Sequence, residues 1–124
     1  MSTMFRENIQ KLIDKLDGGI AGVLMGFDGI PLDSYAKRGF GDSLPDIQTL
    51  AAEFAHLVSQ ARRTVQSVDA GALAEVTIRT DTVTLVITVL TNEYFLACAM
   101  LPAAAVGKAR YLVRIAAPQL RSEL

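Results

Sequence analysis

Residues that support chemistry are scarce in this sequence. Its 124 residues include a single cysteine, Cys98, and a single histidine, His56. One cysteine forms no internal disulfide, so the fold does not require an oxidising compartment. One histidine leaves too little material for a metal cluster or for a Ser-His-Asp or Cys-His site. We therefore expect no catalytic residues, no metal and no cofactor, and we expect Cys98 to be a buried strand residue.

Strong charge of one sign and long apolar runs are also missing. The 12 basic and 13 acidic residues nearly balance, and no basic run is longer than a pair such as Arg62-Arg63. This balance disfavours nucleic acid as the main partner. The apolar stretches are too short and too interrupted to cross a bilayer. Glu7 precedes any apolar run, which is untypical of a signal peptide. The sequence predicts a soluble, cytoplasmic protein with no membrane partner.

Apolar residues, in contrast, are abundant. They make up 51% of the chain, and the mean hydropathy is +0.32. The length predicts one domain over residues 1–124. Because a domain of this size has little interior relative to its surface, we expect part of its apolar area to be covered by another chain.

The spacing of apolar residues predicts three helices. The first covers about 3–17 and the last begins after Pro102. A long helix is predicted over about 44–68, with Ser43 as its cap. Its core-facing stripe is Ile47, Leu50, Ala51, Phe54, Val58, Ala61 and Val65. Its opposite face carries Thr49, Ala52, His56, Ser59 and Arg63, flanked by Glu53 and Gln60.

A glycine-rich segment ahead of this helix has two possible explanations, a phosphate-binding loop and a hairpin. Phosphate-binding loops place glycines between a strand and the start of a helix. Here the glycines lie within and between two apolar segments, 20–26 and 30–35. Asp28-Gly29 between them is typical of a primed hairpin turn, which needs residues that tolerate positive φ. Pro31 lacks a backbone donor and places the second strand at the sheet margin. We predict a hairpin.

Three further strands follow the long helix, over about 73–80, 83–90 and 94–101. Their short connections predict an antiparallel meander, and strands that are apolar on both faces require helices above and below. The predicted fold class is α/β (α+β): a single layer of five antiparallel strands in the order helix-strand-strand-helix-strand-strand-strand-helix. The long helix covers one face and the two terminal helices cover the other.

This arrangement resembles the Roadblock family, which includes the dynein light chains of Roadblock type and bacterial MglB proteins. The resemblance runs from Phe5 to Leu120 and is carried by "GVLMGFDGIPLDSY", the long second helix and "VTLVITVL…YFLACAML". It implies a profilin-like fold and a non-enzymatic homodimer, or a heterodimer with a paralogue. Such a dimer binds a small Ras-like GTPase, with a possible GTPase-activating role. In this family the edge strand after the long helix pairs with its copy, and the two long helices pack side by side.

The residues themselves favour the same surface. Strand 73–80 has no proline and no lysine, the residues that usually protect an exposed sheet edge. Small side chains at Ala52 and Ser59 would let a second helix approach closely, although exposed small residues also serve helix propensity or solubility alone. The dimer interface is therefore expected to include Ala52, Ala55 (at the margin), Ser59, Leu73, Glu75, Thr77 and Arg79.

The resemblance also implies a GTPase-binding platform on the paired long helices. The contact candidates that it gives are Thr49, Glu53, His56, Gln60 and Arg63. We do not expect Arg63 to act as an arginine finger. Two other functions stay open: a scaffold that tethers a larger complex without affecting nucleotide turnover, and a small-molecule sensor with a ligand pocket.

Overall fold

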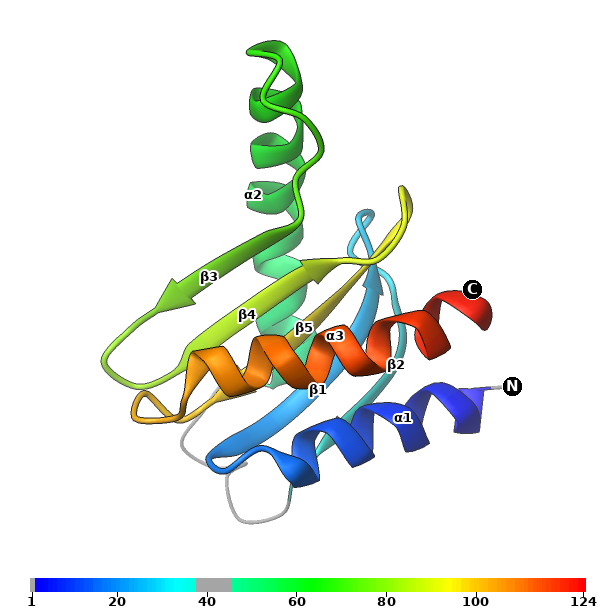
Figure 1. Cartoon of the computed structure of the whole chain (residues 1–124), viewed down its shortest axis with the longest axis vertical. Helices are drawn as coiled ribbons and strands as arrows, with labels where there is room; N and C mark the ends of the chain where they lie inside the picture. Colours follow the sequence, from blue (N-terminus) through cyan, green and yellow to red (C-terminus); the bar gives the residue numbers. More distant parts are fainter. Residues whose placement is uncertain (1, 38–45) are drawn as a thin grey trace.

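A five-stranded antiparallel sheet forms the middle layer of the protein. The computed structural model describes residues 2–37 and 46–124 (Figure 1). The strands are β1 (Gly19–Gly26), β2 (Pro31–Ala36), β3 (Glu75–Arg79), β4 (Thr84–Val89) and β5 (Tyr94–Met100), and the helices are α1 (Ser2–Lys15), α2 (Ile47–Ser67) and α3 (Val106–Ser122). The strands lie in the order β2-β1-β5-β4-β3. The predicted element order, the antiparallel pairing and the marginal position of the Pro31 strand are confirmed.

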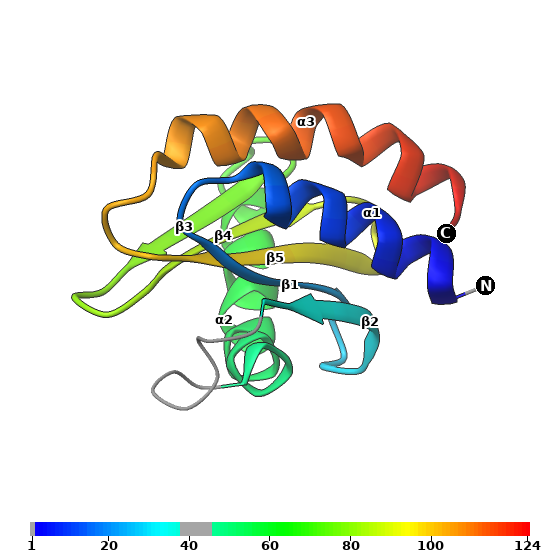
Figure 2. The same cartoon turned by 90° about the horizontal axis from the view of Figure 1, so that it is seen from below.

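Helices cover both faces of this sheet. Figure 2 shows α1 and α3 together on one face and α2 on the other. The residues of β5 alternate between the two sides, since Leu96 and Cys98 join the cluster under α1 and α3, whereas Phe95 and Ala97 join the cluster under α2. Side chains of successive strand residues point to opposite faces, so a strand that is apolar throughout supplies both cores.

The glycine-rich segment forms a hairpin, as predicted, but its turn is of another kind. Between β1 and β2, only Gly29 has a positive φ, of 85°, whereas a primed turn would give Asp28 a positive φ as well. The Gly29 N–H donates to the Gly26 carbonyl oxygen, and the Asp28 carboxylate accepts from the Ile30 N–H. The register between β1 and β2 shifts between Leu24 and Met25. A longer turn followed by a left-handed glycine therefore replaces the expected two-residue turn.

The beginning of α2 also differs from the prediction. Asp46 is the cap, and its carboxylate accepts hydrogen bonds from the N–H groups of Gln48 and Thr49. This satisfies two of the amides that have no partner within the helix. The predicted cap, Ser43, and Pro45 lie outside the described residues. The helix starts at Ile47, three residues after the expected boundary.

Two glycines let α1 approach β1 closely. A Cβ atom added at Gly22 would lie 2.7 Å from Cγ2 of Ile9, and one added at Gly19 would lie 2.7 Å from the backbone oxygen of Ile13. The Ile9 atom belongs to a side chain, whereas the Ile13 oxygen belongs to the backbone of α1, which moves only if the helix is displaced. Gly19 is therefore required for the tight connection between α1 and the sheet.

We expect Gly19→Ala to lower the free energy of unfolding by about 1–3 kcal/mol, since the new methyl group displaces the end of α1. Gly107→Ala is the matched control, because a Cβ atom at Gly107, in the first turn of α3, meets nothing within 4 Å. That change should be neutral or stabilising by up to about 1 kcal/mol. Urea denaturation of both variants measures the difference, and equal midpoints would contradict the packing argument.

Candidate protein-interaction surface

The fold separates His56 and Cys98, the two residues whose side chains are most suited to catalysis. His56 is exposed on α2, whereas Cys98 is buried beneath α1 and α3 on the other face of the sheet. Burial raises the pKa of the Cys98 thiol to about 12. Within residues 2–37 and 46–124, no group of three His, Cys, Asp or Glu side chains could hold a metal ion. None of the described helices combines the length and the apolar character of a membrane span.

The free edge of β3 carries backbone groups that point away from the sheet. The Ala74 carbonyl oxygen accepts from the Val89 N–H, and the Thr80 N–H donates to the Val83 carbonyl oxygen. Residues that bond to a neighbouring antiparallel strand alternate with residues that face away from it. The N–H and C=O groups of Glu75, Thr77 and Arg79 therefore point to the open side, where β3 has no neighbour in the sheet.

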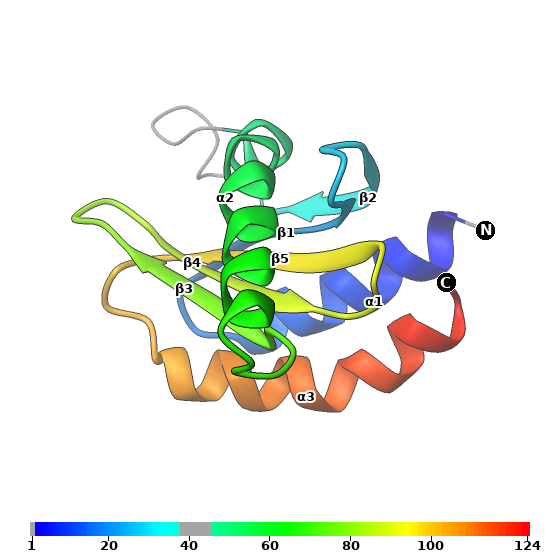
Figure 3. The same ribbon diagram turned by 90° about the horizontal axis from the view of Figure 1, so that it is seen from above.

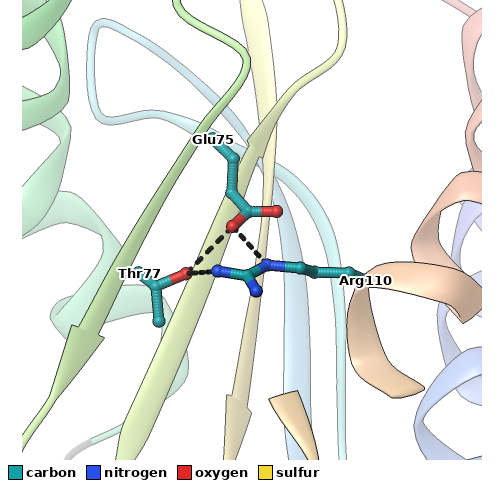
Figure 4. A network of polar contacts seen from close by, with 3 residues as sticks. All are labelled: Glu75, Thr77 and Arg110. Carbon is teal, nitrogen blue, oxygen red and sulfur yellow. Dashed lines mark hydrogen bonds and ion pairs between the residues drawn. The ribbon is translucent and has the colours of Figure 1, made fainter. Parts of the chain in front are cut away.

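The side chains of these three residues lie on the α3 face of the sheet. Glu75 Oε2 accepts from Arg110 Nε of α3 at 2.6 Å and from the Thr77 hydroxyl at 3.1 Å (Figure 4). Arg79 Nη2 donates to the Pro102 carbonyl oxygen at 3.1 Å. Leu73 precedes the strand and packs against the cluster under α2. The polar side chains of β3 thus lie beside α3, and its apolar ones lie on the α2 face.

Helix α2 extends past this edge. Figure 1 shows its C-terminal part projecting beyond β3, and Figure 3 shows the helix lying across the sheet. The side chains that α2 buries all lie between Ile47 and Val58. Ala61 and Val65, which continue the predicted core stripe, are only half-buried. The stripe therefore continues past Val58, the last fully buried side chain of α2.

Arg62 joins α2 to two turns of the sheet, the one between β1 and β2 and the one between β4 and β5. Its guanidinium carbon lies 4.1 Å from the centre of the Phe27 ring, and Nη1 donates to the Asn92 carbonyl oxygen at 3.1 Å. An arginine stacked on an aromatic ring and bonded to a carbonyl group fixes the helix at this point. Local sequence patterns do not predict this contact, because it joins residues 30 or more positions apart.

The two flanks of α2 differ in character. Ala52 and Ser59 are half-buried on the flank that carries Arg62, and Ala55 is buried against the sheet rather than at the margin of the outer face. On the opposite flank, Leu57 is 47% exposed and Val68, the helix C-cap, is 67% exposed. With Ala61 they follow one another at spacings of four and seven residues, and therefore lie on one side of the helix. We call Leu57, Ala61 and Val68 the apolar flank.

The apolar flank was not among the predicted interface residues, although the sequence carries a signal for it. Leu57 and Val68 lie off the core stripe, where a helix that covers only its own sheet would carry polar residues. The five GTPase-contact candidates Thr49, Glu53, His56, Gln60 and Arg63 are all exposed, whereas Ala52 and Ser59, predicted on the same face, are half-buried. The five candidates form one continuous polar face along α2, on the side away from the sheet.

The spaces beneath the helices are filled by side chains. On both faces of the sheet, Val, Leu, Ile, Ala and Phe side chains pack into the two apolar clusters. A surface groove of about 190 Å³ lies between α1 and α3, with Leu12 and Leu112 among its lining residues. The described interior is mainly apolar, with Thr84 as a buried polar residue, whereas the pocket of a small-molecule sensor would need a polar group directed into a cavity.

Solved structures of similar proteins share this fold. MglC from Myxococcus xanthus is 30% identical, with 98% of this chain and 99% of that chain covered and a TM-score of 0.70. A Roadblock/LC7 domain from Streptomyces avermitilis is 19% identical over 94% of each chain, with a TM-score of 0.81. The gliding protein MglB from Thermus thermophilus is 15% identical over 98% of this chain and 88% of that chain, with a TM-score of 0.84. No protein-family model and no curated protein matches the sequence.

The chain belongs to the Roadblock family. The similarity to MglC, to MglB and to a Roadblock/LC7 domain supports a regulator or scaffold of the Roadblock type. The resemblance that the sequence analysis identified is thus confirmed at the level of family and fold.

The burial of Cys98 predicts its reactivity. A thiol with a pKa of about 12 stays protonated at neutral pH, and the thiolate is the reactive form. We expect no modification of the folded protein by iodoacetamide at pH 8, and complete modification in 6–8 M urea (about the range that unfolds small domains). Mass spectrometry of the intact chain measures both. Rapid labelling of the folded protein would show that β5 is accessible.

Proposed function

We propose that this protein forms a homodimer through β3 and α2, and that the dimer binds a small Ras-like GTPase on the outer faces of its paired α2 helices. The observation that carries the proposal is the combination of a free β3 edge with a helix that extends past it (Figure 1). A heterodimer with a paralogue would use the same two elements.

Backbone pairing supports the β3 contact. An edge strand with unpaired N–H and C=O groups is a template for another strand. A second copy, related by a twofold axis, offers the same groups in antiparallel orientation and satisfies both edges at once. Val76 and Ile78 of β3 are half-buried on the α2 side. Pairing extends the apolar surface on that side across the junction.

Helix packing supports the α2 contact. The projecting end of α2 would lie over the sheet of the second copy, where its half-buried residues Ala61 and Val65 find a surface to cover. The apolar flank would face the second α2, and fully burying a Leu or Val side chain contributes about 1.5–3 kcal/mol. We therefore assign the helix–helix contact to Leu57, Ala61 and Val68, in preference to Ala52 and Ser59, which lie on the Arg62 flank.

The dimer can be tested by two variants of adjacent residues. Leu57→Glu places a charge on the apolar flank and should raise the dimer dissociation constant at least about tenfold. His56→Glu introduces the same residue on the outer face and should leave the dimer unchanged. Light scattering across a dilution series measures both. A monomeric wild-type protein at micromolar concentration would contradict the proposal, as would equal effects of the two substitutions.

The outer face supports the GTPase contact. Its five candidate residues are exposed and polar, with Glu53 acidic and Arg63 basic. In the proposed dimer, the outer faces of both α2 helices would be exposed on the same side of the joined sheet. The Roadblock resemblance implies a small Ras-like GTPase there. We propose that the platform orders the catalytic groups of the GTPase itself, and that Arg63 contributes to binding and not as an arginine finger.

Binding to the small Ras-like GTPases of the same genome, each loaded with GDP or with a GTP analogue, tests this platform. We expect one of them to bind in a nucleotide-dependent way. Arg63→Glu should weaken that binding about tenfold or more, because it reverses a charge at the contact. Lys15→Glu, on α1 at the opposite face, is the matched control. Isothermal titration calorimetry measures the affinities.

Phosphate release separates the regulator from the scaffold. A regulator changes the rate of GTP hydrolysis, whereas a scaffold binds a GTPase or another protein without changing it. If Arg63→Lys binds normally but abolishes a stimulated rate of hydrolysis, Arg63 acts as a finger and our assignment of its role is wrong. Absence of binding to every GTPase in either nucleotide state would contradict the GTPase proposal.

A further inference from the structure

We infer that Glu75 and Arg79 form a self-complementary charge pair that fixes the register of the β3–β3 contact, with Thr77 on the twofold axis, and selects a second copy of this chain as the partner. The inference rests on the proposed dimer. It goes further by naming the register, the residues that set it and the preference for an identical chain.

The backbone restricts the possible registers. Only Glu75, Thr77 and Arg79 turn their N–H and C=O groups to the open edge of β3 as the structure describes it. In a symmetric antiparallel contact these residues must therefore face one another. Centring the contact on Thr77 joins all three, as Glu75 with Arg79 of the second copy, Thr77 with its own copy, and Arg79 with Glu75. Each facing pair exchanges two hydrogen bonds, so no outward group of β3 is left without a partner.

The side chains distinguish this register from its neighbours. A contact centred on Glu75 or on Arg79 sets two like charges directly opposite each other. One centred on Val76 pairs Glu75 with Thr77 and leaves Arg79 opposite Leu73. One centred on Ile78 brings Glu75 opposite Asp81 of the second copy, again with like charge. Opposite charges across an antiparallel pair are stabilising and like charges are destabilising, so the Thr77-centred register is favoured.

Glu75 has the capacity for a second cation. Both of its hydrogen bonds within the protomer use Oε2, to Arg110 and to Thr77, and Oε1 takes part in neither (Figure 4). A carboxylate accepts several donors. Glu75 can therefore keep Arg110 of its own chain on one oxygen and receive Arg79 of the second copy on the other.

Arg79 is free to reach that oxygen. Its side chain is exposed, and one donor, Nη2, bonds to the Pro102 carbonyl oxygen. A guanidinium group has five N–H donors in a planar fork, so it can bond to a carboxylate while retaining the bond to a carbonyl group. On the other face of the sheet, Val76 would lie opposite Ile78 of the second copy, which joins two apolar side chains beneath α2.

Selection of an identical chain follows from this pattern. Each copy carries one acidic and one basic residue, placed at equal distances on either side of Thr77, so two identical strands match at both positions. A paralogue with a different order of charges at these positions would lose one or both pairs. The charge pattern of β3 thus distinguishes a homodimer from a heterodimer.

Two single charge reversals test the register. In the Glu75→Arg homodimer, arginine faces arginine twice, and in the Arg79→Glu homodimer, glutamate faces glutamate twice. Each should raise the dimer dissociation constant by about 30-fold. When the two variants are mixed, each chain meets its complement at both positions. The mixed dimer should therefore recover an affinity within about threefold of the wild type.

Native mass spectrometry of the mixture, with one variant carrying a tag, measures the three dimers together. Lys15→Glu is the control for a reversed charge away from β3 and should dimerise normally. Arg79→Glu carries the test alone if Glu75→Arg, which loses the Arg110 ion pair, does not fold. In that case the Glu75→Gln and Arg79→Glu mixture should dimerise more tightly than Arg79→Glu by itself.

The outcomes separate this inference from the dimer itself. Recovery in the mixture supports the Thr77-centred register. If folded single variants dimerise as tightly as the wild type, or if folded variants fail to combine in the mixture, the register is wrong while the dimer stands. If the wild-type protein is monomeric, the proposed dimer fails and the register fails with it.

Discussion

The unsatisfied backbone of one strand is the constraint on which the rest of this structure depends. Three residues of β3 turn their N–H and C=O groups to an open edge, whereas the opposite edge, β2, begins with a proline that has no donor. A further strand can therefore pair with the open edge at β3 more easily than with the edge at β2. The fully buried residues of α2 end at Val58, and the rest of the helix projects beyond β3, on the side of the open edge (Figure 1).

The two faces of the sheet differ in what they leave available. On the face of α1 and α3, the helices lie beside each other, and Gly19 and Gly22 let α1 approach β1 closely, so apolar surface there is covered within the chain. On the other face, one helix covers a sheet that is wider than the helix. The Arg62 contact with Phe27 and Asn92 fixes the helix over the sheet, and the remainder extends past the edge. Because of this asymmetry, the apolar side chains and backbone groups that the protomer leaves uncovered lie mainly at β3 and α2.

Most of the fold could be predicted from the sequence because its patterns are strong and local. Strands 83–90 and 94–101 carry apolar residues on both faces, which predicted helices above and below the sheet. The structure has helices on both faces. The errors occurred where geometry depends on few residues: the cap at Asp46 in place of Ser43, and the turn in which only Gly29 has positive φ. For the candidate surface, the β3 edge was predictable from missing prolines and lysines. The position of Leu57 off the core stripe was also visible in the sequence, but periodicity alone does not show where a sheet ends beneath a helix.

The projecting end of α2 also bears on how readily a chain without a partner would be degraded. Beyond Val58 the helix buries no side chain in its own protomer, and segments with few buried contacts open at low free-energy cost. In the proposed dimer this partly apolar helix end would be covered, whereas a solitary copy would expose it to proteases and chaperones. Quality control would then remove surplus copies, and the number of finished assemblies would follow the supply of partners.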